Sequence, residues 1–155
     1  MIREACISDF DALSNLEDQV FYMHLNARPD MIKQKPFTGD YFEKCLNDEK
    51  TKIFVLEENG EILGHCITRL WETDNHPMFH AMKILEIDDL CVDEKARGKN
   101  IGRQLFNRAK AYAKETGAAH LELMVWSFNK NAKQFYEYLG MSERISRMEM
   151  IIEQE

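Results

Sequence analysis

The sequence predicts a mixed α/β fold with the element order β-α-α-β-β-β-α-β-α-β. Helical and strand patterns alternate along the chain, and a strong two-residue turn signal lies between two strand patterns near its middle. The chain has 155 residues, of which 45% are hydrophobic, which is enough for one core. We therefore expect a single domain over residues 1–155.

A short strand and two helices are expected first. Residues 2–6 form the strand, Ser8 caps the first helix and Pro29 ends it. Thr38 caps a second helix that runs through Leu46. The apolar stripe of the first helix consists of Phe10, Leu13, Leu16, Val20, Phe21 and Leu25.

The middle of the chain predicts three strands. Residues 51–58 and 61–71 flank the dipeptide Asn59-Gly60, a typical hairpin turn. The third strand pattern covers residues 84–92.

The segment 72–82 joins the second and third of these strands and is rich in His, Asp and aromatic residues. Such a loop can line a substrate pocket, although an ordinary surface loop has the same composition. His76 and His80 have the spacing of helical metal ligands, but Pro77 interrupts a helix there. We expect no metal site.

The most informative stretch is residues 97–102, RGKNIG, which lies between the third strand and a periodic helix. Gly98 and Gly102 let the backbone approach a ligand closely, and Asn100 tolerates a positive φ. The loop amides would open a helix whose first N–H groups are unpaired and whose dipole attracts anions. Three cations reinforce that field, namely Arg97, Lys99 and Arg103. The pattern predicts a phosphate-bearing ligand, and it matches neither the dinucleotide fingerprint nor a P-loop.

Three more elements follow this loop. The helix ends at Gly117, a suitable residue just beyond a helix end, and residues 120–126 alternate as a strand. Asn129 opens another helix that ends at Gly140, and a last strand follows it.

Two motifs in this order resemble the GNAT superfamily of acetyl-CoA-dependent N-acetyltransferases. Residues 97–102 match the signature Arg/Gln-x-x-Gly-x-Gly/Ala, with Asn100 in place of the central Gly. Residues 129–136 match Asn-x-x-Ala-x-x-x-Tyr, and Leu139-Gly140 follows. The resemblance implies a twisted mixed sheet of six to seven strands, about four helices on both faces, and acetyl-CoA as co-substrate.

The resemblance also implies where the cofactor binds. The loop 97–102 would hold the pyrophosphate, and the amides of the pantetheine arm would pair with the edge of the third central strand, splayed from the next strand by a bulge. Asn129 would bond the arm, although it could also be only a helix cap. The implied cofactor-binding residues are Leu90, Cys91, Val92, Arg97, Gly98, Lys99, Asn100, Ile101, Gly102, Arg103, Asn129 and Lys133.

Acetyl transfer to an amine requires a proton acceptor. An alkylamine has a pKa near 10.4, so its neutral form at pH 7 costs roughly 4 to 5 kcal/mol. Glu86 and Asp88 share one strand face, and Asp89 nominally lies on the other. The resemblance implies that Asp88 or Glu86 is the base, although any one of these acids could instead anchor a loop. It also implies that Tyr136 protonates the leaving thiolate, whereas periodicity alone would make Tyr136 a core aromatic.

Cys91 is read as a packed strand residue, because no His lies where it would activate the thiol. The four cysteines, Cys6, Cys45, Cys66 and Cys91, are far apart, so we expect buried reduced thiols without a disulfide or zinc.

The net charge is −7, and the basic residues concentrate in residues 95–114. This distribution disfavours nucleic acid, and the absence of long apolar runs disfavours a membrane and secretion, so we expect a cytoplasmic protein. The expected partner is a small-molecule amine of the polyamine, aminoglycoside or amino-acid type. A protein N-terminus or lysine, a regulatory or inactive CoA-binding domain, and a helix–sheet interaction module are the alternatives, and a homodimer is left open.

Overall fold

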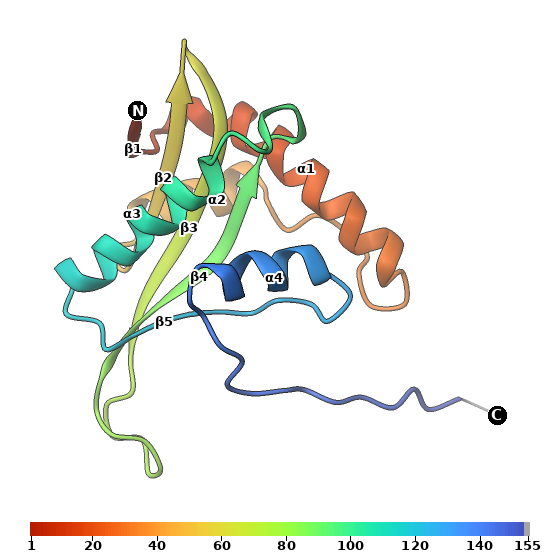
Figure 1. Ribbon diagram of the computed structural model, residues 1–155, viewed down its shortest axis with the longest axis vertical. Helices are drawn as coiled ribbons and strands as arrows, with labels where there is room; N and C mark the ends of the chain where they lie inside the picture. Colours follow the sequence, from red (N-terminus) through yellow and green to blue (C-terminus); the bar gives the residue numbers. More distant parts are fainter. Residues whose placement is uncertain (154–155) are drawn as a thin grey trace. The chain divides into compact units, whose positions relative to one another are not determined.

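The computed structural model describes residues 1–153, in two compact units that meet in sequence between Met124 and Val125. The first unit holds all five strands and all helices except the last (Figure 1). Its elements are β1 (Ile2–Glu4), the 3-10 helix η1 (Ile7–Asp9), α1 (Phe10–Ala27), α2 (Gly39–Asn47), β2 (Thr51–Glu58), β3 (Glu61–Glu72), β4 (Lys83–Val92), the 3-10 helix η2 (Glu94–Ala96), α3 (Ile101–Glu115) and β5 (His120–Leu123). No helix of the described residues is long and apolar enough to cross a membrane.

The strands form one mixed sheet in the order β1-β2-β3-β4-β5. The first four strands pair antiparallel, and β5 pairs parallel with β4. The predicted mixed α/β fold class is therefore confirmed, with five strands among the described residues instead of six to seven.

The predicted last strand is not formed within the described residues. Residues 141–153 adopt no helix or strand, and the large apolar side chains beyond Met141 are exposed, among them Met148 (93%) and Ile151 (75%). A strand gains its stability from cross-strand side-chain pairs. Without such pairs, an apolar segment does not by itself form a strand.

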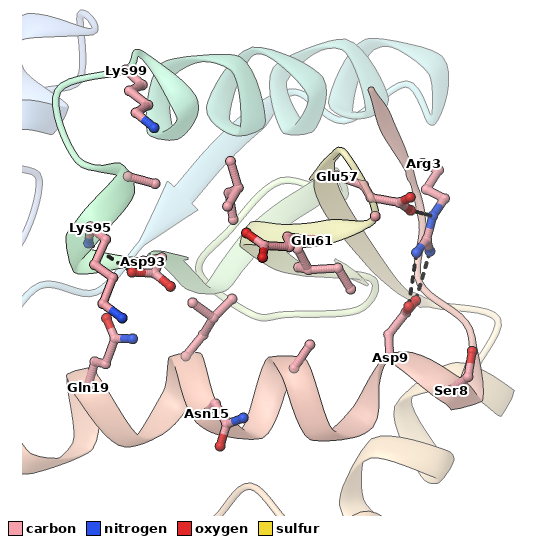
Figure 2. A pocket seen from close by; sticks show the side chains of 16 residues that line it. Arg3, Ser8, Asp9, Asn15, Gln19, Glu57, Glu61, Asp93, Lys95 and Lys99 are labelled. Atoms are coloured by element: carbon pink, nitrogen blue, oxygen red, sulfur yellow. Dashed lines mark hydrogen bonds and ion pairs between the residues drawn. The ribbon is translucent and has the colours of Figure 1, made fainter.

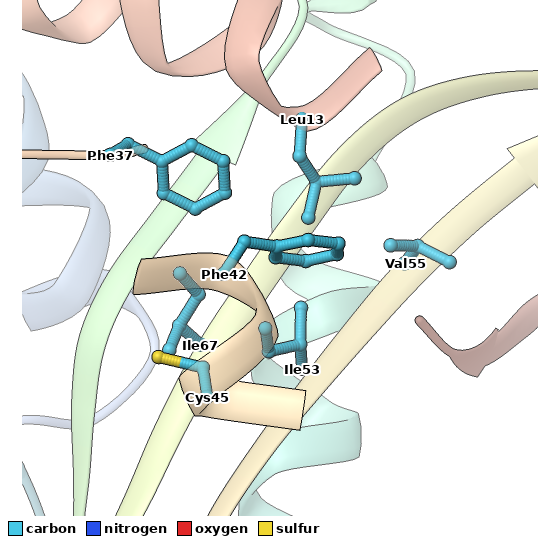
Figure 3. Packing of buried hydrophobic residues seen from close by; sticks show 7 residues of the cluster. All are labelled: Leu13, Phe37, Phe42, Cys45, Ile53, Val55 and Ile67. Atoms are coloured by element: carbon cyan, nitrogen blue, oxygen red, sulfur yellow. The ribbon is translucent and has the colours of Figure 1, made fainter. Parts of the chain in front are cut away.

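One face of the sheet is covered by α1 and α2. Leu13 of α1, Phe42 of α2 and Phe37 between the helices pack on Ile53 and Ile67 of the sheet (Figure 3). Phe37 and Phe42 also form an aromatic pair, with ring centroids 5.7 Å apart. This cluster holds α1 against β3 and thereby fixes every side chain that α1 presents to the sheet.

The opposite face is covered by α3, which packs on β2, β3 and β4. Phe54 of β2 alternates away from Ile53 and meets Tyr112 of α3, with ring centroids 5.6 Å apart. Gly64 of β3 lies where α3 begins. A Cβ added to it would lie 2.7 Å from the carbonyl oxygen of Cys91, so this backbone approach requires glycine.

Local signals account for most element ends. Thr38 caps α2 as predicted, because its side chain accepts a hydrogen bond from the backbone amide of Tyr41. Asn59 and Gly60 have φ values of 53° and 80°, as the tight β2–β3 hairpin turn requires. Ser8 does not cap α1, because it lies within η1, which precedes the helix. The Asp9 carboxylate accepts a hydrogen bond from the backbone amide of Cys6 instead.

Three of the four cysteines are buried free thiols, as predicted, namely Cys45, Cys66 and Cys91. Cys6 is exposed, which corrects the prediction that all four are buried. It follows the short strand β1, which ends at Glu4 before the chain enters the core.

In residues 125–153 of the second unit, the structure has one helix, α4 (Lys130–Tyr138). Asn129 caps it, with its side chain accepting from the amide of Ala132 at 3.2 Å. Gly140 adopts a φ of 94° just beyond the helix end, as the sequence predicts.

Replacing Gly64 by Ala tests the close approach of α3 and β4. The new methyl would press on the Cys91 carbonyl and on Ile101 and Leu105, so we expect a loss of about 1–3 kcal/mol in the free energy of unfolding, measured in urea. Gly39→Ala is the matched control, since its Cβ would meet only one atom of Phe10 at 3.9 Å. Equal stability of the two variants would contradict the packing described.

Candidate active site

The loop 97–102 adopts the backbone that its sequence predicts. Gly98 and Asn100 have φ values of 80° and 64°, both in the left-handed region. Asn100 is the N-cap of α3, and its side chain makes no capping hydrogen bond. The first amides of this 15-residue helix therefore lack a side-chain cap and can receive an anion.

The side chains of the loop divide into two groups. Ile101 is buried, so it can offer a ligand only its backbone. Arg97, Lys99 and Arg103 are exposed, and the Arg97 guanidinium lies 3.9 Å from the Glu94 carboxylate. The loop thus combines a helix N-terminus with cationic side chains, as a phosphate site requires.

The edge of β4 is paired over only part of its length. Its parallel pairing with β5 runs from Ile84 to Ile87, opposite residues 120–123. Beyond Ile87, in the part of the chain that the structure describes, β4 has a strand partner only in β3. Leu90, Cys91 and Val92 therefore lie on a strand that has no partner among the described residues on its β5 side.

A bulge lies where β4 and β5 part. Ile67 pairs with Asp89 and Thr68 with Ile87, so Asp88 is the extra residue of β4. The bulge shifts the alternation of side chains by one. Asp89 was expected on the face opposite Asp88, but Asp88 bonds Arg69 and Asp89 bonds His65, two residues on one face of β3.

The two predicted base residues lie on this same face in different settings. The Asp88 carboxylate accepts from the Arg69 guanidinium at 3.0 Å. Burial raises the pKa of Glu86, and the carboxylates of Asp88 and Glu122 raise it further. Glu86 therefore holds a proton more readily than an ordinary surface carboxylate.

The structure also assembles a cluster that the sequence did not predict. It consists of Glu17 of α1, His65 of β3 and Asp89 of β4. The His65 Nε2 lies 3.0 Å from Glu17 Oε1 and 2.9 Å from Asp89 Oδ2. The imidazole is fully buried, while the Glu17 and Asp89 side chains are 14% and 26% exposed. The only signals in the sequence are an acid beside the apolar stripe of α1 and a histidine inside an apolar strand.

The cluster has unusual protonation equilibria. Burial alone would lower the pKa of His65, but its bonds to Asp89 and Glu17 outweigh burial and raise it to about 9. Burial raises the pKa of Glu17 to about 7, against the opposing hydrogen bond of His65. Burial also disfavours the Asp89 anion, but the bond and charge of His65 prevail and lower its pKa.

Glu17, His65 and Asp89 offer three ligating atoms within 4.8 Å of one another. A histidine that binds metal usually donates its second ring nitrogen to an acceptor. The His65 Nδ1 is buried and has no hydrogen-bond partner among the described residues. We therefore interpret the cluster as a hydrogen-bonded ionic network.

The histidine pair of the 72–82 loop is engaged differently, since His76 Nδ1 accepts hydrogen bonds from the backbone amides of Met78 and Phe79.

Cys91 is a packed strand residue, as predicted. Its side chain is buried, and its Sγ donates to the carbonyl oxygen of Leu16 in α1 at 3.2 Å. Burial raises the pKa of the Cys91 thiol, and the Asp89 carboxylate raises it further, so the nucleophilic thiolate is disfavoured.

A polar cavity of about 690 Å³ lies between α1 and the start of α3 (Figure 2). Lys99 borders it, and at its far end Arg3 bonds both Asp9 and Glu57 at 2.8 Å. The cavity adjoins β3, which occupies one edge of β4, so the open edge of β4 faces the other way. The cavity and the strand edge are therefore separate surfaces.

The remaining predicted site residues belong to the second unit. The Asn129 side chain caps α4, and the Lys133 Nζ bonds Glu143 at 2.7 Å. The Tyr136 ring contacts that of Phe135, with centroids 5.2 Å apart. Their predicted roles toward the cofactor remain predictions.

Known proteins resemble this chain in sequence and in fold. An uncharacterized N-acetyltransferase of Methanocaldococcus jannaschii is 33% identical over 112 residues, which cover 72% of this chain and 48% of that protein. The thialysine N-epsilon-acetyltransferase of Bos taurus is 26% identical over 152 residues, which cover 92% and 75%. The x-ray structure of a tetramutant of the BH1408 protein from Bacillus halodurans has a TM-score of 0.94 at 32% identity, covering 98% of this chain and 99% of that one.

The chain spans about half the length of the M. jannaschii relative and 64% of a second relative, from Archaeoglobus fulgidus. The model of the acetyltransferase (GNAT) family matches residues 12–141, which include the loop at the start of α3, the open edge of β4 and helix α4. The chain therefore belongs to the GNAT family of acetyltransferases.

Proposed function

We propose that the protein is an N-acetyltransferase that moves an acetyl group from acetyl-CoA directly to a primary amine of a small molecule. One observation carries the proposal. Within the first unit, only Asp93 and η2 separate an open strand edge from an uncapped helix N-terminus with a left-handed loop. The first feature suits a pyrophosphate and the second suits a chain of amides, and CoA contains both in that sequence.

The cofactor would be held mainly by backbone groups. The amides of the 97–102 loop would receive the pyrophosphate, with Arg97 and Lys99 adding charge. The pantetheine arm would pair with Leu90, Cys91 and Val92 as an added strand. When bound, acetyl-CoA supplies the activated acetyl thioester.

The transfer itself requires two proton movements. The amine must lose a proton before its nitrogen forms the new bond to the acetyl carbon, and the sulfur must gain one as its bond to that carbon breaks. Asp88 and Glu86 are the proposed carboxylates that draw the ammonium group to β4 and take its proton. Tyr136 is the proposed donor to the thiolate, with Asn129 and Lys133 as further cofactor contacts.

An acidic acceptor face favours a cationic substrate. The chain carries a net charge of −7, and Glu86, Asp88 and Asp89 lie together on β4. The Bos taurus relative, whose name gives thialysine as the acceptor, supports a small amine. A protein N-terminus or a lysine side chain is the alternative acceptor, and a cytoplasmic location remains an expectation.

An acceptor screen tests the proposal. The protein is incubated with acetyl-CoA and, in separate reactions, a polyamine, an aminoglycoside, a basic amino acid and a peptide with a free N-terminus, while free thiol is measured. We expect thiol release above the rate of acetyl-CoA hydrolysis with a small amine. Release with the peptide alone would favour the alternative acceptor. Acetyl-CoA binding without transfer to any amine would indicate a regulatory domain.

The loop before α3 is tested by replacing Gly102 with Val. The branched side chain would stand where the pyrophosphate is proposed to lie, so we expect acetyl-CoA to bind at least about tenfold more weakly in calorimetry, a loss of about 1.4 kcal/mol. Gln104→Val places the same side chain on an exposed position of α3 and serves as the control. Affinity like that of the wild type in both variants would remove the pyrophosphate from this loop.

Tyr136→Phe removes only the hydroxyl and keeps the ring. A hydroxyl at the rim contributes only about 1 kcal/mol, so the melting temperature should fall by at most about 2–4 °C. Acetyl transfer should nevertheless slow by about tenfold or more if the hydroxyl protonates the thiolate. Tyr138→Phe, on an exposed tyrosine of the same helix, controls for the helix surface. An unchanged rate, or a large loss of stability alone, would make Tyr136 a packing residue.

A further inference from the structure

We infer that Glu17, held by His65 and Asp89, is a second acceptor for the proton that the amine loses. The inference rests on the proposed acetyl transfer and adds to Asp88 and Glu86 a carboxylate from α1, a helix that carries none of the motif residues.

The three residues form one network around a single nitrogen. Glu17 and Asp89 approach the same His65 Nε2, at 3.0 and 2.9 Å, so the two carboxylates share one N–H group. The imidazole is wholly buried and stacks near Phe37, with centroids 6.4 Å apart. Only the carboxylates reach the surface, Glu17 at 14% exposure and Asp89 at 26%. A proton can therefore enter or leave the network only through them.

The network adjoins the place where the thioester is proposed to lie. Asp89 is the residue after the bulge at Asp88, and it precedes Leu90 on the open edge of β4. His65 pairs across the sheet with Cys91 of the same edge. We therefore expect a ligand amine that approaches this edge on the α1 face to meet the partly exposed carboxylates of Asp89 and Glu17.

The charges leave one carboxylate in surplus. One anion balances a protonated His65, and Asp89 fills that role because its pKa is lowered. Glu17 then lies beside the ion pair of His65 and Asp89, which is already balanced in charge. Burial of the Glu17 carboxylate raises its pKa to about 7. A base with a pKa near the working pH combines a useful ionised fraction with useful basicity.

The other titratable groups near the network do not neutralise Glu17. His24, on the same helix, has its pKa lowered by burial, so burial favours its neutral form. Cys91, on β4, stays a thiol because burial raises its pKa. His65 and Asp89 are thus the charges that set the protonation of Glu17.

The proton step is balanced. An N–H bond of the ammonium breaks and an O–H bond forms on Glu17, directly or through one water. The nitrogen keeps the electron pair and attacks the acetyl carbon. After the thiol leaves, Glu17 releases its proton to solvent.

The pH dependence of kcat/KM tests the inference. In the wild type we expect an acidic limb with a midpoint near pH 7, because Glu17 accepts a proton only when ionised. Glu17→Gln should remove this limb and lower kcat/KM about tenfold or more at pH 8. His65→Gln removes the cation and should move the midpoint upward, whereas Asp89→Asn removes the repelling anion and should move it downward. Opposite shifts are not expected from a merely structural role.

Three comparisons can overturn the inference. Asp18→Asn removes an α1 carboxylate that pairs instead with Lys35 at 2.6 Å, and it should leave the limb in place. An acidic limb that survives in Glu17→Gln but vanishes in Asp88→Asn or Glu86→Gln would show that only the carboxylates of β4 accept the proton of the amine. A divalent metal that copurifies with the wild type and is lost in Glu17→Gln would make the cluster a metal site.

A readout without turnover keeps this inference separate from the proposed activity. In the carbon-13 NMR spectrum of protein labelled in its glutamate carboxyl groups, one resonance should titrate near pH 7 and be absent from Glu17→Gln. Titration of every glutamate near its ordinary pKa would overturn the inference even if amines are acetylated. A failure of all amines with the expected titration present would instead refute the proposed acetyl transfer. Acetyl-CoA-induced thermal stabilisation of each variant checks that it is folded.

Discussion

The parting of β5 from β4 after Ile87 is the constraint on which the candidate site depends. Four residue pairs hold the two strands in parallel, and the bulge at Asp88 follows at once. A β4–β5 ladder continued past Ile87 would cover the edge at Leu90 and Val92, and a β3–β4 ladder without the bulge would keep Asp89 on the other face of the sheet. The parting of β5 thus opens the strand edge, and the bulge beside it gathers the acidic side chains.

The packing of the helices makes this irregularity useful. The aromatic cluster around Phe37 and Phe42 fixes α1 on one face, which brings Glu17 to His65. On the other face Gly64 admits the start of α3, and that helix carries the loop with the left-handed Gly98 and Asn100. A cationic loop and an acidic strand face are therefore held on neighbouring parts of one framework.

The sequence predicted the features that depend on near neighbours. The cap at Thr38, the hairpin turn at Asn59-Gly60 and the positive φ of Asn100 each follow from one or two residue types, and the structure has them. Asp89 was assigned to the wrong face because a bulge arises from pairing between strands, which one strand pattern does not contain. The contact of Glu17 with His65 spans 48 positions, and no local pattern encodes it. The predicted last strand is absent from the described residues for a related reason, since an apolar segment forms a strand only where a partner strand is present.

The contact between Gly64 and the Cys91 carbonyl has a consequence for the entropy of binding. That carbonyl points toward β3, between Leu90 and Val92 of the edge on which the pantetheine arm is proposed to pair, and it is confined by the backbone of β3 and the first side chains of α3. An edge already fixed in the free protein loses little conformational freedom when a ligand strand is added to it. The ordering cost of recognition then falls mainly on the flexible arm of the cofactor, because the fold has already ordered the protein side.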